Sequence, residues 1–180
     1  FVCLFAGLFN VLIVPFNSLQ PAFISEVLGQ DSEFVSIIAA SFLVGMLIGN
    51  LVLPPWLQRR SKRTVFVCSG VLLGLAYVSL GQVHLIENTW VIGIVIGAIA
   101  LLMGLALTGV SLPLQVSMMS HVDQVQMSRV TSFVYTLALA AVPIGSGLLA
   151  AVLTVAGINA IFVAAGALTT ILFLLQLRSH

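Results

Sequence analysis

The stretch WVIGIVIGAIALLMGLALTGVSLPLQVSMM, at residues 90–119, contains no charged side chain. About 20 such residues suffice to cross a hydrocarbon core of about 30 Å. Inside that core the backbone must satisfy its own hydrogen bonds in a helix or a closed barrel. A barrel needs short alternating strands, and the stretch has no such alternation. It therefore predicts a membrane-spanning helix whose far end projects into water.

The rest of the chain has the same character. Of its 180 residues, 61% are hydrophobic and 6% are charged, and the mean hydropathy is +1.24. A soluble domain carries roughly a quarter charged residues, so this composition excludes a soluble surface. We expect an all-α polytopic membrane protein, embedded in the lipid bilayer as one six-helix bundle over residues 1–180. The predicted helices are at residues 1–24, 34–57, 64–83, 90–119, 129–156 and 158–177.

Charged residues fall in the predicted loops, and successive loops must alternate between the two sides of the membrane. All the basic residues fall on one side, namely Arg59, Arg60, Lys62, Arg63, Arg129 and Arg178. Glu26, Asp31, Glu33 and Glu87 fall on the other side. Because Lys and Arg are retained on the cytoplasmic side, we expect a multi-pass protein of the plasma (inner) membrane with both ends of this segment cytoplasmic. The basic loop, Arg59–Arg63, is expected to contact anionic lipid headgroups there.

Several kinds of chemistry are not supported by the residues present. The three histidines lie in three different segments and the two cysteines do not form a CxxC pair, so we expect neither a metal site nor a cofactor. The membrane segments lack the His, Asp or Glu groups that hydrolysis or group transfer needs. We therefore expect no catalytic residue and no enzyme activity, and no nucleic-acid partner.

Uncharged polar residues are the remaining candidates for a binding site. Asn10, Asn17 and Gln20 are spaced seven and three apart, which places them on one face of the first helix. Pro15 and Pro21 interrupt the same helix, and the carbonyls that they free are tolerated only beside protein or a watery cavity. This face suits an amphipathic solute. Alternatively, the amides hydrogen-bond to neighbouring helices.

The fourth predicted helix has a GxxxP break at Gly109–Pro113. If the six helices form two inverted triplets, the first and fourth helices correspond, and interrupted helices at corresponding positions point to a binding site. On the fourth helix we expect Met103, Leu107 and Gln115 to line the cavity. Other small residues, such as Gly45 and Gly49, are expected to let helices approach closely.

The segment GNLVLPPWLQRRSKR, at residues 49–63, resembles the basic loop between the second and third helices of the major facilitator superfamily. Further segments are similar to the fourth and fifth helices of that family's carboxyl-terminal half, namely Pro113–Gln115, Ser128–Ser132 and Pro143–Gly147. The first helix is similar to that of macrolide-efflux and siderophore-exporter members. The likeness covers the whole chain, with two departures: Gln58 and Ser61 stand where the family often has an acidic residue and a glycine.

This resemblance implies half of a twelve-helix secondary transporter, helices seven to twelve, which works with a missing amino-terminal six-helix half. It implies proton-coupled efflux, by antiport, of a hydrophobic or amphipathic small molecule of the drug, macrolide or siderophore type, and hence antibiotic resistance. The missing half would supply the acidic residues for coupling. Because the chain opens at Phe1 in an apolar run, we expect it to be part of something longer. The alternative is a non-transporting helical membrane scaffold or assembly module, without a central cavity.

Overall fold

The computed structural model describes residues 18–20, 22–27, 29, 33–59, 61–86, 88–121, 124–154 and 157–178. Over these ranges, the chain forms five long α-helices: α2 (Glu33–Arg59), α3 (Lys62–Gln82), α4 (Thr89–His121), α5 (Gln124–Leu153) and α6 (Ile158–Arg178). A short π-helix, η1 (Phe23–Val27), precedes α2, and a 3-10 turn, η2 (Val83–Leu85), follows α3. Each of the five is long and apolar enough to cross a membrane. The predicted all-α membrane bundle is confirmed.

The helix ends lie close to the predicted positions, with one exception. The first predicted helix lies mostly outside the described residues, which include only its last turn and then η1. α2, α3, α4 and α6 begin and end within two residues of the predicted ranges. α5 begins at Gln124 instead of Arg129, because residues 124–128 contain no Gly or Pro that would stop the helix. It ends at Leu153 instead of Ala156.

Prolines lie inside three of these helices, at Pro54 and Pro55 in α2, Pro113 in α4 and Pro143 in α5. The predicted break at Gly109–Pro113 is wrong, because α4 continues as one helix to His121. A proline lacks the N–H that would bond the carbonyl four residues earlier, and its ring crowds that carbonyl. Since Pro113 is buried, packing around it supports the helix across this missing bond.

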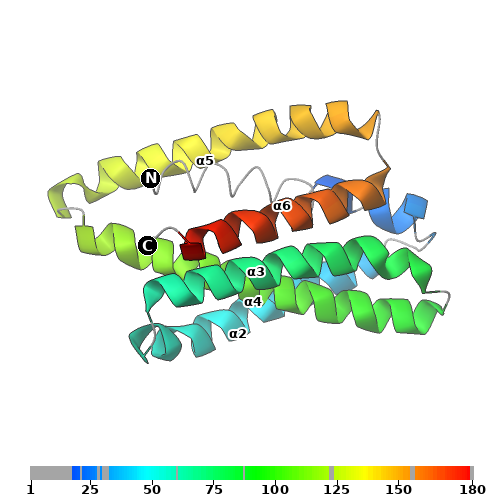
Figure 1. Ribbon diagram of the computed structural model, residues 1–180, viewed down its shortest axis with the longest axis horizontal. Helices are drawn as coiled ribbons and strands as arrows, with labels where there is room; N and C mark the ends of the chain where they lie inside the picture. The colour runs from blue at the N-terminus through cyan, green and yellow to red at the C-terminus, as the bar shows by residue number, and fades with distance from the viewer. Residues whose placement is uncertain are drawn as a thin grey trace.

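Consecutive helices run in opposite directions, so α2, α4 and α6 end where α3 and α5 begin (Figure 1). Packing proceeds in the order α2, α4, α3, α6, in which each helix contacts the next along its length. α5 lies at the edge of the bundle and makes few contacts with α6. Among the described residues, the core is therefore formed by α2, α4, α3 and α6, with α5 at its edge.

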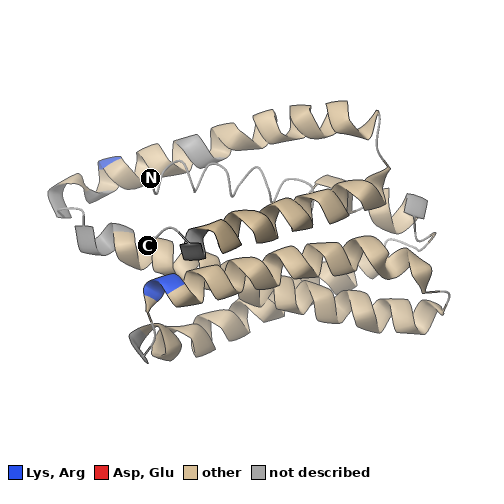
Figure 2. Ribbon diagram, viewed as in Figure 1, with Lys and Arg blue, Asp and Glu red and all other residues tan. Residues whose placement is uncertain are grey.

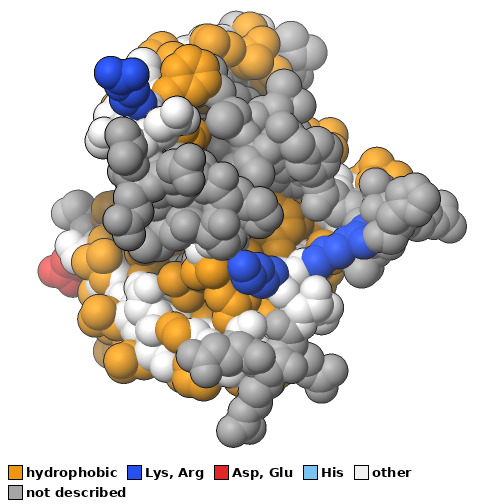
Figure 3. Space-filling view, turned by 90° about the vertical axis from the view of Figure 1, so that its left-hand side faces the viewer, with side chains coloured by type: hydrophobic (Ala, Val, Ile, Leu, Met, Phe, Trp, Pro, Cys, Tyr) orange, Lys and Arg blue, Asp and Glu red, His pale blue; other side chains and the backbone are white. Residues whose placement is uncertain are grey.

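The described basic side chains gather at one end of this bundle. Lys62 and Arg63 lie in the first turn of α3 and Arg129 lies near the start of α5, and both of these helix starts lie at the same end (Figure 2). A view onto this end shows the blue Lys and Arg side chains among hydrophobic (orange) and uncharged (white) groups, with an acidic side chain at the left edge (Figure 3). Glu33 begins α2 at the opposite end. Asp123, between α4 and α5 in the sequence, lies outside the described residues.

Glycines hold α2 and α4 together in parallel. A Cβ atom at Gly45 would overlap the backbone carbonyl of Leu101, and a Cβ at Gly104 would overlap that of Phe42. One turn further along, Gly49 meets the Thr108 side chain. Because lipid tails are as apolar as Leu side chains, close packing of this kind drives helix association in membranes. The predicted packing role of Gly45 and Gly49 is confirmed.

The same arrangement joins α3 and α6, which run antiparallel. A Cβ at Gly74 would overlap the Thr170 hydroxyl and approach the Gly166 carbonyl. Gly70, one turn earlier on α3, meets the ring of Phe173. Each helix pair therefore joins a GxxxG segment on one helix (residues 45–49 or 70–74) to a GxxxT segment on the other (residues 104–108 or 166–170).

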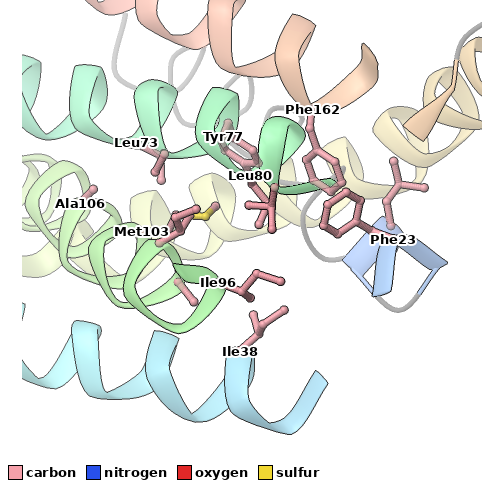
Figure 4. Close-up of a cluster of buried hydrophobic side chains, with 14 of the residues drawn as sticks. Phe23, Ile38, Leu73, Tyr77, Leu80, Ile96, Met103, Ala106 and Phe162 are labelled. Atoms are coloured by element: carbon pink, nitrogen blue, oxygen red, sulfur yellow. The ribbon is translucent and has the colours of Figure 1, made fainter. Parts of the chain in front are cut away.

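Large apolar side chains fill the space between the two pairs (Figure 4). Tyr77 of α3 stacks on Phe162 of α6 with ring centroids 6.3 Å apart, and Phe23 of η1 meets Phe162 edge-on at 5.2 Å. Ile38 of α2 and Ile96 of α4 extend the same cluster. Through the contact between Phe23 and Phe162, the end of the first predicted helix is attached to α6.

We predict that Gly45→Ala and Gly74→Ala each lower the free energy of unfolding by about 1–3 kcal/mol, because the added methyl groups force two backbones apart. Gly147→Ala in α5 is the matched control, since a Cβ there meets no described atom within 4 Å. Its higher helix propensity should raise stability by up to about 1 kcal/mol. Thermal unfolding of the purified protein in detergent measures all three. Equal stability of the three variants would contradict the proposed role of the crossings.

Candidate functional site

The structure describes four of the six residues that the sequence predicts for a cavity. Asn10 and Asn17 lie outside the described residues. Gln20 is half-buried, and its Nε2 donates a long hydrogen bond of 3.5 Å to the carbonyl oxygen of Val35 near the start of α2. One amide donor of Gln20 therefore contacts a neighbouring helix, as in the alternative interpretation of this face.

Met103 and Leu107 lie within the core. Met103 is 1% exposed, and its side chain points from α4 toward Tyr77 and Leu80 of α3 (Figure 4). Leu107 is half-buried and packs against the same cluster. In this structure both side chains fill space between α3 and α4.

Gln115 is exposed on α4, two residues beyond Pro113. It lies far from Gln20 along the membrane normal. Gly93 of α4 sits beside Phe34 of α2, next to the Val35 carbonyl that Gln20 contacts. Gln115 follows Gly93 by 22 residues on the same helix, which corresponds to about 33 Å at 1.5 Å per residue. Gln20 and Gln115 can therefore border two ends of a path through the membrane but cannot form one compact site.

Other polar side chains, which sequence reasoning missed, lie inside the membrane segments. Thr108 is 4% exposed, and its hydroxyl donates to the carbonyl oxygen of Gly104 at 3.1 Å and lies 3.5 Å from that of Met46 on α2. Ser69 is buried on α3 beside Gly109 of α4. Both side chains lie at helix crossings, where they contribute to packing.

Asn50 is the exposed member of this polar group. Its Nδ2 donates a 2.9 Å hydrogen bond to the carbonyl oxygen of Met46, and the side chain lies on the surface of α2. An amide in an otherwise apolar span is costly against lipid. Asn50 is the single Asn between Phe34 and Leu57. This was the signal in the sequence that could have identified it as a candidate site residue.

The basic loop connects α2 to α3 at one end of the bundle. Arg59 ends α2, Arg60 lies outside the described residues, and Lys62 and Arg63 are exposed in the first turn of α3. That turn holds no acidic residue, and Ser61 makes no side-chain capping bond. Positive charge at a helix N-terminus opposes the helix dipole. The placement therefore serves a purpose other than helix stability, and retention of the loop on one side of the membrane is sufficient to explain it.

No group of three or more His, Cys, Asp or Glu side chains that could hold a metal ion occurs in the part of the chain that the structure describes. Away from the helix ends, the described membrane helices offer an uncharged surface with isolated amides and hydroxyls. Gln115 and Asn50 lie on the surfaces of α4 and α2, the tightly joined parallel pair. Such groups can donate and accept hydrogen bonds but cannot carry out acid–base or nucleophilic chemistry.

Comparison with protein families gives one match. The family model of the Major Facilitator Superfamily matches residues 1–178. No curated protein and no solved structure matches the chain. The match covers nearly the whole sequence, including all five described membrane helices. The chain therefore belongs to the Major Facilitator Superfamily.

Proposed function

We propose that this chain is the carboxyl-terminal half of a proton-coupled exporter of hydrophobic or amphipathic small molecules. Membership of the family makes it part of a secondary transporter. The observation that carries the finer proposal is the uncharged character of the membrane segments. Residues 1–24, 34–57, 64–83, 90–119, 130–156 and 158–177 contain no Asp, Glu, Lys, Arg or His. Such walls attract apolar surface and isolated hydrogen-bonding groups, and they offer no counter-ion to a strongly charged solute.

Proton coupling requires a titratable group within the membrane. Those segments of this chain contain no carboxylate and no histidine, so in the proposal the coupling carboxylate comes from an amino-terminal six-helix half. Transport then proceeds by rocking of the two halves around a site between them. The tight α2–α4 and α3–α6 crossings support rigid-body movement of this half, because helices joined backbone to backbone cannot slide without separating.

Gln115, Gln20, Asn17 and Asn10 are the proposed polar contacts along the path, with Met103 and Leu107 as an apolar layer behind it. Gln115 has the strongest structural support, since its amide is exposed one turn from a proline-weakened point of α4. Asn10 and Asn17 enter the proposal from the sequence pattern alone. The basic loop, through Arg59, Arg60, Lys62 and Arg63, is proposed to lie in the cytoplasm, with both ends of the segment on that side.

A non-transporting scaffold is the second candidate function. It is favoured by the burial of Met103 and by the contact between Gln20 and Val35, since both place expected cavity residues in packing contacts. A scaffold predicts that polar substitutions on the surface of α4 leave solute movement unchanged.

For the exporter, we predict that Gln115→Leu raises the dye concentration needed for half-maximal efflux by about 2- to 10-fold, which corresponds to one lost hydrogen bond of about 0.5–1.5 kcal/mol. The measurement is efflux of a lipophilic fluorescent dye from cells that make the full-length protein. Gln82→Leu, an exposed Gln at the end of α3, is the matched control and should leave efflux unchanged. An unaltered dye dependence in Gln115→Leu and in the double variant Asn17→Ala with Gln20→Ala would favour the scaffold.

Orientation has a separate test. In a protein whose two native cysteines are replaced by Ala, Ser61→Cys and Leu85→Cys place single thiols near the two ends of α3, both at exposed positions. We expect a membrane-impermeant thiol reagent to label Ser61→Cys only in inside-out vesicles and Leu85→Cys only in right-side-out vesicles. The reverse pattern would show that the basic loop lies outside the cytoplasm.

A further inference from the structure

α2 has one buried line and two exposed flanks. Ile38, Gly45, Gly49 and Leu53 form the buried line, and the two glycines contact α4. At about 100° per residue, the exposed positions form one continuous face opposite that line, with Ala40 and Leu47 at its middle, and the two flanks are the edges of this face. The flanks can be compared because they lie on the same helix at the same depth.

The two flanks differ in chemistry. One, which we call the Asn50 flank, lies about 80–140° from the buried line and consists of Ser36, Ala39, Leu43 and Asn50. The other, the aliphatic flank, lies about 100–160° away in the opposite sense and consists of Ile37, Val44, Ile48 and Leu51. Bulky aliphatic side chains suit lipid tails, whereas an exposed amide does not. The two flanks therefore face different surroundings.

Asn50 brings two acceptor oxygens to its flank. Its Nδ2 is bonded to the Met46 carbonyl, while the structure gives its side-chain oxygen no partner among the described residues. The backbone carbonyl of Asn50 would normally accept from the residue four positions later, which is Pro54 and has no N–H. Both oxygens are therefore available to hydrogen-bond donors from outside α2.

These oxygens lie within the hydrocarbon depth of the membrane. The membrane span of α2 runs from Glu33 to Leu57, so Gly45 is its midpoint. Asn50 is five residues further on, or about 7.5 Å, whereas the hydrocarbon core extends about 15 Å from its centre. A helix packed here could offer only side-chain donors, since its own N–H groups are already bonded. Water and solute groups can satisfy both oxygens at once.

We propose that the Asn50 flank of α2 lines a water-filled part of the transport path, and that Asn50 binds hydroxyl, amide or ammonium donors of the solute there. The aliphatic flank faces lipid. This inference rests on the proposed transport function and adds α2 to the path that the first predicted helix and α4 are proposed to border. Leu43, on the same flank at the centre of the membrane, provides an apolar surface next to the amide.

The test compares single-cysteine variants two at a time. Each is made in the full-length protein from which the native cysteines have been removed. A charged methanethiosulfonate reagent reacts with thiolates, which form in water and not in hydrocarbon. We expect Asn50→Cys to react about tenfold faster or more than Ile48→Cys, its partner on the opposite flank. Leu43→Cys and Val44→Cys repeat the comparison at mid-membrane and do not depend on Asn50. Excess dye should slow labelling of Asn50→Cys.

Equal rates within both pairs, or faster labelling of the aliphatic flank, would overturn the proposal. If Gln115→Leu weakens dye efflux as expected while neither pair shows a difference, transport stands and only the placement of α2 is wrong. A further variant distinguishes a position on the transport path from a lipid-facing position without a thiol reagent. If Asn50 lines the transport path, Asn50→Leu should shift the half-maximal dye concentration by about 2- to 10-fold and leave the melting temperature unchanged. At a lipid surface, it should raise the melting temperature and leave efflux unchanged.

Discussion

Hydrocarbon provides neither hydrogen-bonding partners nor a hydrophobic force between helices, and the rest of this structure depends on that constraint. The first consequence is that each described span is a helix that satisfies its own backbone. The second is that helices associate only where backbones come close enough for dispersion contacts. Gly45 against Leu101 and Gly74 against Gly166 provide these contacts. The core side chains around Tyr77 and Phe162 then fill the space that the crossings leave.

The same constraint makes polar side chains informative. Thr108 and Ser69 are buried at crossings, where neighbouring backbone atoms or tight packing accommodate their hydroxyls. Asn50 and Gln115 are exposed on helices that the crossings hold rigidly together. A rigid unit with a few exposed amides fits the proposed alternating access, because in that mechanism movement occurs between units and each unit keeps its shape. Among the described residues, α5 lies at the edge of this unit.

Much of the fold could be predicted because its signals are local. Long uncharged stretches predicted the helices, and four of the five described spans have ends within two residues of the predicted ones. The start of α5 was wrong because residues 124–128 are polar yet compatible with a helix. The break at Pro113 was wrong because one missing backbone bond does not end a helix whose proline is packed on its neighbours.

The candidate site was harder to predict, for a physical reason. In a soluble helix the apolar stripe marks the core, but lipid is as apolar as the core, so Met103 and Leu51 look alike in sequence although one is 1% and the other 78% exposed. The sequence by itself determined that the chain is a helical membrane bundle with its basic residues on one side, because charge and length decide how a segment meets a bilayer. Only the tertiary structure decided which face of each helix is buried, because that depends on which glycines meet across a crossing.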